Sequence, residues 1–458
     1  MPTAPTATPD LIPRLRVALD GRLITPDDAD YDQVRTVFPG NFNRRPAAIV
    51  RPADDADVAR VVTLAGESGV TLAVRSGGHS PAGHSGVDGG LVLDLRSMND
   101  VRIGADERTA WAEAGATAGQ YTAAAGAHGL ATGFGDTGSV GLGGITLAGG
   151  AGFLSRKYGL TVDEVLAADI VTADGKRLRV DADNHPDLFW AIRGGGGNFG
   201  VATRFQYRLH EVGEFTGGML ILPAAAEVID GFVAAADAAP AELSTIMMAM
   251  VAPPMPFLPP EVHGKLVIAG LLAYAGPDDA AEQVLAPFRA LATPLADMVK
   301  PMPYHDMFEP EPEGYRPVAA SRSLYVDTVD EAFATTALEQ LQASTAQVSA
   351  VQLRVLGGAI GRVPADATAY AHRDRKVMVN VAAMYQQPEE AAEHEAWVGK
   401  LAEALGQGPG VYPGFLGDEG PDRVREAYPG ETWDRLVAVK RQYDPANLFR
   451  HNHNIPVG

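Results

Sequence analysis

Three glycine-rich loops are the part of this sequence most suited to binding chemistry. The first runs from Arg75 to His79, the second from Gly133 to Gly152, and the third from Arg193 to Gly200. Glycine lets the backbone approach a ligand closely, and successive exposed N–H groups form a concavity that suits a pyrophosphate. One such loop alone would be read as a tight turn. Three in the first half of the chain predict a large phosphate-bearing ligand.

Two common nucleotide-binding motifs do not explain these loops. A Rossmann site needs G-x-G-x-x-G between a strand and a helix, with an acidic residue about 20 positions later. The segment Gly141-Leu142-Gly143-Gly144 lacks the last glycine in register, and a helical stretch, not a strand, precedes Gly194 to Gly197. No Walker A lysine pattern is present. The pattern therefore predicts a ligand bound by loops of a different α+β fold.

Composition excludes several other classes of function. The 458 residues exceed what one hydrophobic core usually serves, so two or three structural units are expected. A formal net charge of −20 makes nucleic acid an unfavourable partner. The absence of cysteine rules out disulfides, thiolate nucleophiles, cysteine metal sites and thioether bonds, and we expect no metal. With no secretory signal and no apolar membrane span, we expect a cytoplasmic protein that is a monomer or a homodimer.

Hydrophobic periodicity predicts the elements that carry the loops. Residues 1–40 read as a short helical lead-in, and the run from Val70 to Arg75 reads as a buried strand that enters the first loop. The turn Asp174-Gly175 predicts a hairpin between 165–172 and 176–180. Further strands are expected at 91–95, 111–114 and 201–209, and helices at 55–68, 117–128 and 186–193.

The pattern changes near residue 213. Beyond it, apolar runs alternate with helices, which indicates an antiparallel sheet with helices on one face. Its expected strands are 219–222, 245–251, 265–274, 352–356 and 377–383, and its expected helices are 277–291, 330–344 and 388–405. The proline-rich stretches 252–260 and 309–317 are expected to be exposed loops, and a last helix is expected near 432–442.

At this point the motifs resemble a known family. They are RSGGHSPAGHS at 75–85, GGLVLDLRSMN at 89–99, GLGGITLAGGAGFLSRKYGLTVDEV at 141–165, NHPDLFWAIRGGGGNFGV at 184–201 and YDPANLFRHNHNIP at 443–456. They resemble the vanillyl-alcohol oxidase superfamily, nearest the berberine-bridge-enzyme-like oxidases and their bacterial 6-hydroxy-D-nicotine-oxidase-like branch. The resemblance implies a PCMH-type, two-part FAD-binding domain over 1–212 (core 42–212), a substrate domain over 213–415 and a C-terminal segment over 416–458.

The resemblance implies that FAD is bonded covalently through His79. In that family the histidine of the first glycine loop bonds to the 8α-methyl carbon of the flavin, and His84 is the alternative anchor. Many relatives add a second bond from a cysteine, whose position here corresponds to Thr137. Because the chain has no cysteine, a single attachment is expected.

The resemblance also implies further cofactor contacts along the loops and the tail. Arg75 to Ser80 with Ser85 should line the pyrophosphate and the ring edge, and Gly149 and Gly150 should lie near the adenine. The first of these segments includes Ser76, Gly77 and Gly78, and the remaining expected contacts are Asp136, Thr137, Gly138, Ser139, Gly143, Gly144, Gly200, Val201, Asn452 and Asn454.

The catalytic base is less clear in the sequence. The position that resembles the family's glutamate is Gln352, and an amide cannot act as a base. Tyr412 resembles a tyrosine found near the flavin and could serve if a neighbouring cation lowers its pKa. Asn452 is the third catalytic candidate, while Tyr304, His305 and Tyr385 are weaker ones. Each aromatic is otherwise explained by packing alone.

These observations predict a flavin oxidase. It would transfer a hydride from a small hydrophobic or aromatic alcohol or amine to FAD, with O2 as acceptor and H2O2 as product. Met247, Met248 and Met250 could line an apolar pocket, although methionines in such a strand more often pack in the hydrophobic core. The alternatives are a tailoring enzyme that cyclises its substrate or uses a flavin–oxygen adduct, an oligosaccharide oxidase, and a flavin-storage protein without catalysis.

Overall fold

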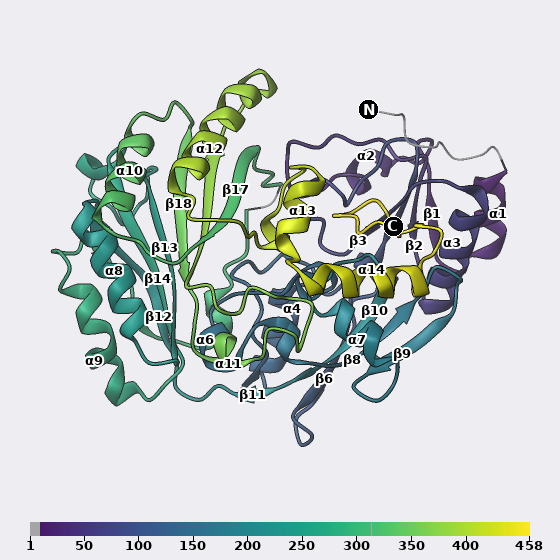
Figure 1. Cartoon of the computed structure of the whole chain (residues 1–458), viewed down its shortest axis with the longest axis horizontal. Coiled ribbons are helices and arrows are strands. Elements are labelled where there is room, and N and C mark those ends of the chain that lie inside the picture. The colour runs from purple at the N-terminus through teal and green to yellow at the C-terminus, as the bar shows by residue number, and fades with distance from the viewer. Residues whose placement is uncertain (1–9, 313) are drawn as a thin grey trace.

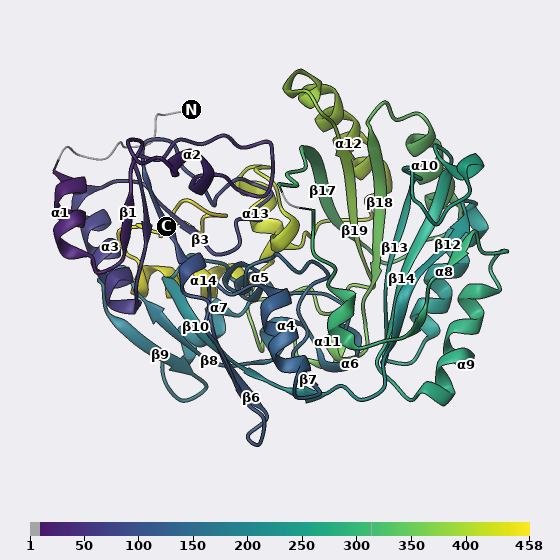
Figure 2. The same cartoon turned by 180° about the vertical axis from the view of Figure 1, so that it is seen from behind.

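The computed structural model describes residues 10–312 and 314–458, and its hydrophobic core falls into two main clusters. The larger cluster joins residues between Leu11 and Phe215 with residues of the C-terminal segment and a few residues between Ile246 and Ala369. The second lies between Leu220 and Leu405. Figures 1 and 2 show the two parts as the two halves of the molecule.

The first half begins with a four-stranded sheet of order β1-β2-β4-β3. Its strands are β1 (Arg22–Ile24), β2 (Ala48–Arg51), β3 (Leu72–Arg75) and β4 (Leu91–Asp94). Strands β2, β4 and β3 are parallel, and helix α3 (Asp55–Ser68) leads from β2 to β3. Asp54 accepts the N–H groups of Ala56 and Asp57, and Gly69 ends the helix at a φ of 65°. This confirms the predicted helix at 55–68.

A five-stranded antiparallel sheet completes the first half, in the order β5-β6-β10-β8-β9. Its strands are β5 (Val101–Gly104), β6 (Thr109–Glu113), β8 (Val165–Val171), β9 (Arg177–Asp181) and β10 (Val201–Arg208). The predicted hairpin is β8 and β9. The helices of this half are α1 (Leu11–Ala18), α2 (Tyr31–Val34), α4 (Ala118–Gly126), α5 (Leu142–Ala148), α6 (Ser155–Tyr158) and α7 (Pro186–Ile192), and a small ladder pairs β7 (Leu130–Ala131) with β11 (His210–Glu211).

The second half is an antiparallel sheet, as its sequence pattern predicts, but it has eight strands over the described residues where five were expected. Helices cover the face on which the second core cluster lies, and β17, β19 and β18 are the strands nearest the first half (Figure 2). The strands are β12 (Thr216–Pro223), β13 (Leu243–Val251), β14 (Leu266–Tyr274), β15 (Ala296–Asp297), β16 (Lys300–Pro301), β17 (Ala319–Val326), β18 (Val348–Val355) and β19 (Val377–Met384). The helices are α8 (Ala226–Ala238), α9 (Asp278–Arg289), α10 (Glu331–Gln342), α11 (Ala359–Arg362) and α12 (Ala391–Leu405).

The C-terminal segment returns to the first half (Figure 1). It contains α13 (Pro421–Ala427) and α14 (Glu431–Tyr443), followed by an extended tail. Inside it, the Lys440 ammonium lies 2.6 Å from Asp444 and donates to the carbonyl oxygens of Asn198 and Phe449. Both charged side chains are fully buried, so this pair holds the tail against the third glycine loop.

Several elements were not predicted from the sequence, and strand β1 lies inside the stretch 1–40 that was expected to be only a helical lead-in. Strand β17 and helix α8 lie in regions without a predicted element, and α5 occupies part of the second glycine loop. Glycine weakens helices by about 1 kcal/mol per residue relative to alanine, so a glycine-rich helix depends on tertiary packing. Leu142, Gly143 and Thr146 of α5 are buried, which supplies that packing.

Candidate active site

A cavity of about 480 Å³ lies where the glycine loops, the C-terminal tail and the large sheet meet. Its size is within the range of small-molecule and cofactor sites. The predicted cofactor residues that line it are Ser76, Gly77, Gly78, His79, Ser80, His84, Ser85, Asp136, Thr137, Gly143, Gly144, Gly200 and Val201. Two predicted catalytic residues, Tyr412 and Asn452, also line it.

The first two glycine loops contact each other directly. A Cβ atom on Gly77 would lie 2.3 Å from the nitrogen of Gly141, and one on Gly141 would lie 2.0 Å from the nitrogen of Gly77. The Ser76 hydroxyl donates to the Ala114 carbonyl at 2.6 Å and accepts the N–H of Gly143 at 3.2 Å. These glycines are therefore required for loop-to-loop contact, independently of any ligand.

His79 projects from the first loop into the cavity. Its ring stacks on Phe38 with the centroids 4.0 Å apart, and its Nε2 lies 2.9 Å from the Ser139 hydroxyl. Burial lowers the pKa of His79 to about 4, although Glu311 and Ser139 act in the opposite direction. The imidazole is therefore neutral at pH 7, as a nucleophile must be.

Two histidines of the tail join His84 on another part of the lining. The ring centroid of His84 lies 5.5 Å from that of His451 and 4.9 Å from that of His453. His451 also contacts the Gly86 carbonyl through Nε2 at 2.8 Å. Burial lowers the pKa of all three, that of His453 to about 4. This neutral cluster connects the tail to the loop after His79.

An ion pair crosses the cavity from the second glycine loop to the large sheet. Arg354 of β18 contacts Asp136 at 2.7 Å, and its other nitrogens donate to Gln352 at 3.0 Å and to the Ala151 carbonyl at 3.0 Å. Its guanidinium also lies over the Phe415 ring, 5.0 Å from the centroid. Among the described residues that line the cavity, Asp136 is the only carboxylate.

Tyr412 does not meet the condition for acting as a base. Its hydroxyl oxygen accepts the N–H of Gly150 at 2.8 Å, and the side chain is buried. Burial raises the pKa of Tyr412 above its ordinary value, although Gly150 and the charge of Arg354 act in the other direction. The phenol therefore stays protonated at neutral pH.

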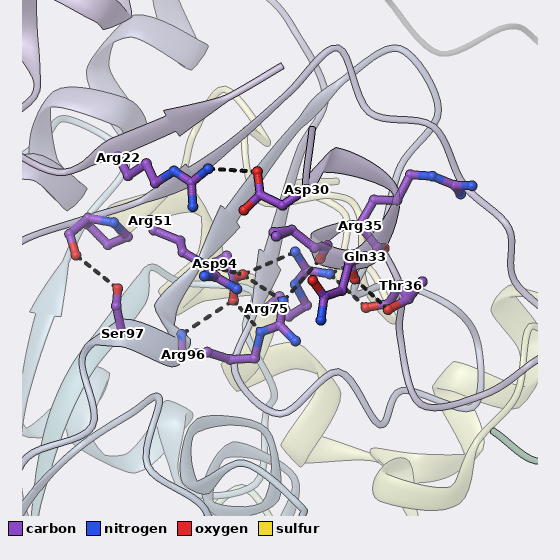
Figure 3. A network of polar contacts seen from close by, with 12 residues as sticks. Arg22, Asp30, Gln33, Arg35, Thr36, Arg51, Arg75, Asp94, Arg96 and Ser97 are labelled. Atoms are coloured by element: carbon purple, nitrogen blue, oxygen red, sulfur yellow. Dashed lines mark hydrogen bonds and ion pairs between the residues drawn. The ribbon is translucent and has the colours of Figure 1, made fainter. Parts of the chain in front are cut away.

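The structure corrects the predicted role of Arg75. Its side chain turns away from the cavity and is almost fully buried, where it contacts Asp94 at 3.2 Å and the carbonyl oxygens of Arg35 and Thr36 (Figure 3). The parallel register of β3 and β4 pairs Arg75 with Asp94, and burial lowers the pKa of Arg75 to about 10. Arg75 therefore stabilises the start of the loop and does not line the cavity.

Other predicted residues lie beside the cavity without lining it. Gly149 and Gly150 have φ values of 135° and 76°, and both contact Tyr412. Gln352 holds Arg354. The remaining predicted residues outside the lining are Gly138, Ser139 and Asn454, of which Ser139 holds His79. Met247, Met248 and Met250 do not line the cavity, nor do Tyr304, His305 and Tyr385.

The residues present fit FAD. Asn452 lines the cavity, and its Oδ1 is buried without a hydrogen-bond partner among the described residues, which leaves an acceptor for a ligand N–H. A Cβ atom on Gly144 or Gly197 would meet no atom within 4 Å, so open space lies above both backbones. Neutral His79 in the same cavity completes a site for a flavin with its phosphates.

Sequence reasoning missed several functional side chains. Arg354 carried one signal, because it lies two positions after Gln352 in a strand and so shares its face. His451 and His453 lie in the tail motif at 443–456 but were not singled out there. The others come from distant segments and had no such signal: Ser321, Asn380, Phe415 and Glu311. Over the residues described, no cluster suited to a metal ion and no helix able to cross a membrane is found.

Comparisons with known proteins agree with this site. A family model described as an FAD binding domain matches residues 46–181, and one described as berberine and berberine like matches residues 410–456. The chain is 31% identical over 457 residues to (R)-6-hydroxynicotine oxidase of Paenarthrobacter nicotinovorans, covering 96% of this chain and 97% of that protein. It is also 31% identical to the FAD-linked oxidoreductase YgaK of Bacillus subtilis, with 96% and 98% covered.

Solved structures share the fold. The crystal structure of 6-hydroxy-D-nicotine oxidase from Arthrobacter nicotinovorans superposes with a TM-score of 0.85 and 27% identity, covering 96% of this chain and 99% of that one. A chitooligosaccharide oxidase gives a TM-score of 0.84 at 23% identity, with 97% and 99% covered, which supports the fold alone. With the glycine loops, the tail and the cavity in place, the chain belongs to the berberine-bridge-enzyme-like family of FAD-dependent oxidoreductases.

Proposed function

We propose that this protein is an oxidase that transfers a hydride from a small hydrophobic or aromatic alcohol or amine to FAD held covalently through His79. O2 would accept the electrons and yield H2O2. The observation that carries the proposal is His79 itself, a neutral imidazole with its ring in the cavity and its Nε2 engaged by Ser139. The absence of cysteine means one attachment only.

The chain's own residues supply binding and proton transfer. Bound FAD would supply the hydride acceptor. Asp136 is placed to accept the proton of the substrate hydroxyl or amine, because one of its oxygens faces Arg354 while Oδ1 has only the Thr137 hydroxyl at 3.3 Å. Tyr412 and Phe415 present aromatic surface beside it. Gln352 then positions Arg354, and an amide at that position does not prevent base catalysis.

The substrate class rests on two supports. The lining near Asp136 combines one ion pair with aromatic rings, which suits a small molecule with one polar reacting group. A relative with 31% identity has 6-hydroxynicotine in its name, a molecule with an aromatic pyridine ring and an aliphatic amine. A tailoring reaction is the second candidate, and anaerobic mixing separates the two, because a substrate oxidation bleaches the flavin whereas a redox-neutral reaction does not.

Mass spectrometry of the unfolded protein tests the attachment. The wild type should carry the mass of one FAD, while His79→Ala should show the polypeptide alone and His84→Ala should retain the flavin. Peroxide release from a panel of alcohols, amines and phenols would then identify the substrate. A wild-type mass equal to the bare polypeptide would refute the covalent link.

A further inference from the structure

Three segments that are distant in the sequence meet at the imidazole of His79. Nε2 of His79 lies 2.9 Å from the hydroxyl of Ser139, and that hydroxyl donates to Oε1 of Glu311 at 2.7 Å. His79 follows β3, Ser139 precedes α5, and Glu311 comes from the proline-rich loop before β17. Phe38 stacks on the other side of the ring. The ring is therefore fixed in both position and orientation.

The direction of these hydrogen bonds determines where the imidazole proton lies. A carboxylate can only accept, so the Ser139 hydroxyl proton points to Glu311. The Ser139 oxygen then accepts a proton from Nε2, which must be the protonated nitrogen of the neutral ring. Nδ1 is left with its lone pair, and it has no hydrogen-bond partner among the residues that the structure describes. Nδ1 is thus the nucleophilic atom.

We propose that Glu311 is a positioning residue for flavin attachment and acts on His79 through Ser139. This step rests on the proposed function, in which His79 carries the flavin. Nothing in the motif around His79 indicates such a residue, because Glu311 and Ser139 are 172 positions apart in the chain. Because Glu311 belongs to a loop of the second half, the second half would take part in attaching the flavin to His79 of the first half.

The chemistry of attachment explains why a carboxylate helps. A bond forms between Nδ1 and the 8α carbon of the flavin, and one C–H bond of that methyl group breaks. Its hydrogen leaves as a proton, and the two electrons pass to the flavin and then, with two protons, to O2 to give H2O2. Substitution at Nδ1 makes the ring cationic until Nε2 releases its proton, which can move toward Ser139 and Glu311. The carboxylate stabilises this positive charge while it develops.

The rate of attachment measures this role directly. Full-length chain produced under flavin limitation is mixed with FAD in air, samples are unfolded at intervals, and the fraction with the added FAD mass is followed. We expect Glu311→Gln to attach flavin about ten- to a hundredfold more slowly, which is the range of a hydrogen bond to a charged group. Ser139→Ala should be at least as slow. The matched control is Glu309→Gln, an exposed glutamate of the same loop that should behave as the wild type.

Two further readouts separate positioning from a general structural effect. The rate in Glu311→Gln should rise with pH, because solvent base replaces the missing carboxylate, while reversible FAD affinity before attachment should be unchanged. The histidyl-flavin peptide from the wild type should carry the flavin on Nδ1. Equal attachment rates in the wild type and Glu311→Gln would overturn the role of Glu311 alone. A wild type that gains no flavin mass would overturn the proposed function, and this step with it.

Discussion

The two sides of the cavity are built in different ways. On the side of the first half, the lining includes nine glycines, which present only backbone, together with neutral histidines and small or apolar side chains. On the side of the large sheet it consists of side chains, with Ser321 from β17, Arg354 from β18 and Asn380 from β19. A backbone lining suits a ligand that every family member shares, whereas side chains can change without disturbing the fold. We therefore expect cofactor binding to depend on shape and substrate chemistry to depend on charge.

The largest expected effect comes from the ion pair that joins the two sides. Asp136→Asn removes the only carboxylate in the described lining, so flavin reduction by substrate should slow by about a hundred- to ten-thousandfold. The proposed attachment of FAD through His79 should be unaffected, because Asp136 does not contact His79 in the structure. Anaerobic stopped-flow absorbance at the visible flavin maximum measures the rate.

Asp106→Asn is the matched control, since that carboxylate is exposed on a hairpin turn far from the cavity. It should reduce its flavin at the wild-type rate. If Asp136→Asn kept the wild-type rate as well, the ion pair between the two sides of the cavity would supply no proton acceptor for the reaction. The two sides of the cavity would then differ in how they bind cofactor and substrate, and not in proton transfer.

The next effect concerns stability on the cofactor side. Lys440→Met leaves Asp444 buried without its cation, which typically costs about 3–5 kcal/mol. Urea unfolding of the flavin-free protein should show this loss, while Lys400→Met on the exposed face of α12 should change the free energy of unfolding by less than about 0.5 kcal/mol. A small effect at Lys440 would mean that the tail is held mainly by apolar contacts.

The side of the cavity formed by the first half was largely predictable from the sequence. Glycine loops, the histidine between them and the tail motif are local signals, and the structure brings 13 predicted cofactor residues to the cavity. Side-chain direction was less predictable: Arg75 belongs to the expected loop, yet strand pairing turns it to Asp94. On the sheet side, Arg354 meets Asp136 across 218 positions of sequence, a contact for which no local pattern exists.

Neutral histidines make the cofactor side sensitive to acid. Because burial lowers the pKa of His79, His84, His451 and His453 below the ordinary value of 6.5, the unfolded chain binds more protons than the native one as pH falls below about 6.5. The free energy of unfolding should therefore decrease from pH 6.5 toward pH 4, by about 1.4 kcal/mol per pH unit for each histidine still neutral in the native state.

Single substitutions can assign this slope to the cluster. His84→Gln should reduce the slope of unfolding free energy against pH by the contribution of one histidine, whereas exposed His128→Gln should leave it unchanged. The test is urea unfolding of flavin-free protein at pH 5 and pH 6. Equal slopes in the wild type and His84→Gln would show that the native cluster already takes up protons in this range.

The smallest effect tests the backbone lining itself, at two glycines that differ in what surrounds them. A Cβ atom on Gly144 would meet no atom within 4 Å and would point into open space at the cavity, while one on Gly77 would meet the backbone of Gly141 at 2.3 Å. Gly144→Ala should stabilise the flavin-free protein by up to about 1 kcal/mol, because alanine favours helix α5. The same methyl group should weaken reversible FAD binding. Gly77→Ala should instead destabilise the fold, because the two loops must separate.

Fluorescence titration with FAD and urea unfolding, applied to both variants, separate these outcomes. If Gly144→Ala binds FAD more weakly and has a larger free energy of unfolding, glycine at this position favours cofactor binding and destabilises helix α5. Unchanged FAD affinity in Gly144→Ala would place the cofactor away from α5. Any dependence of cofactor binding on backbone shape would then come from the first and third glycine loops. In the first loop, Gly77 is already needed for the contact with Gly141.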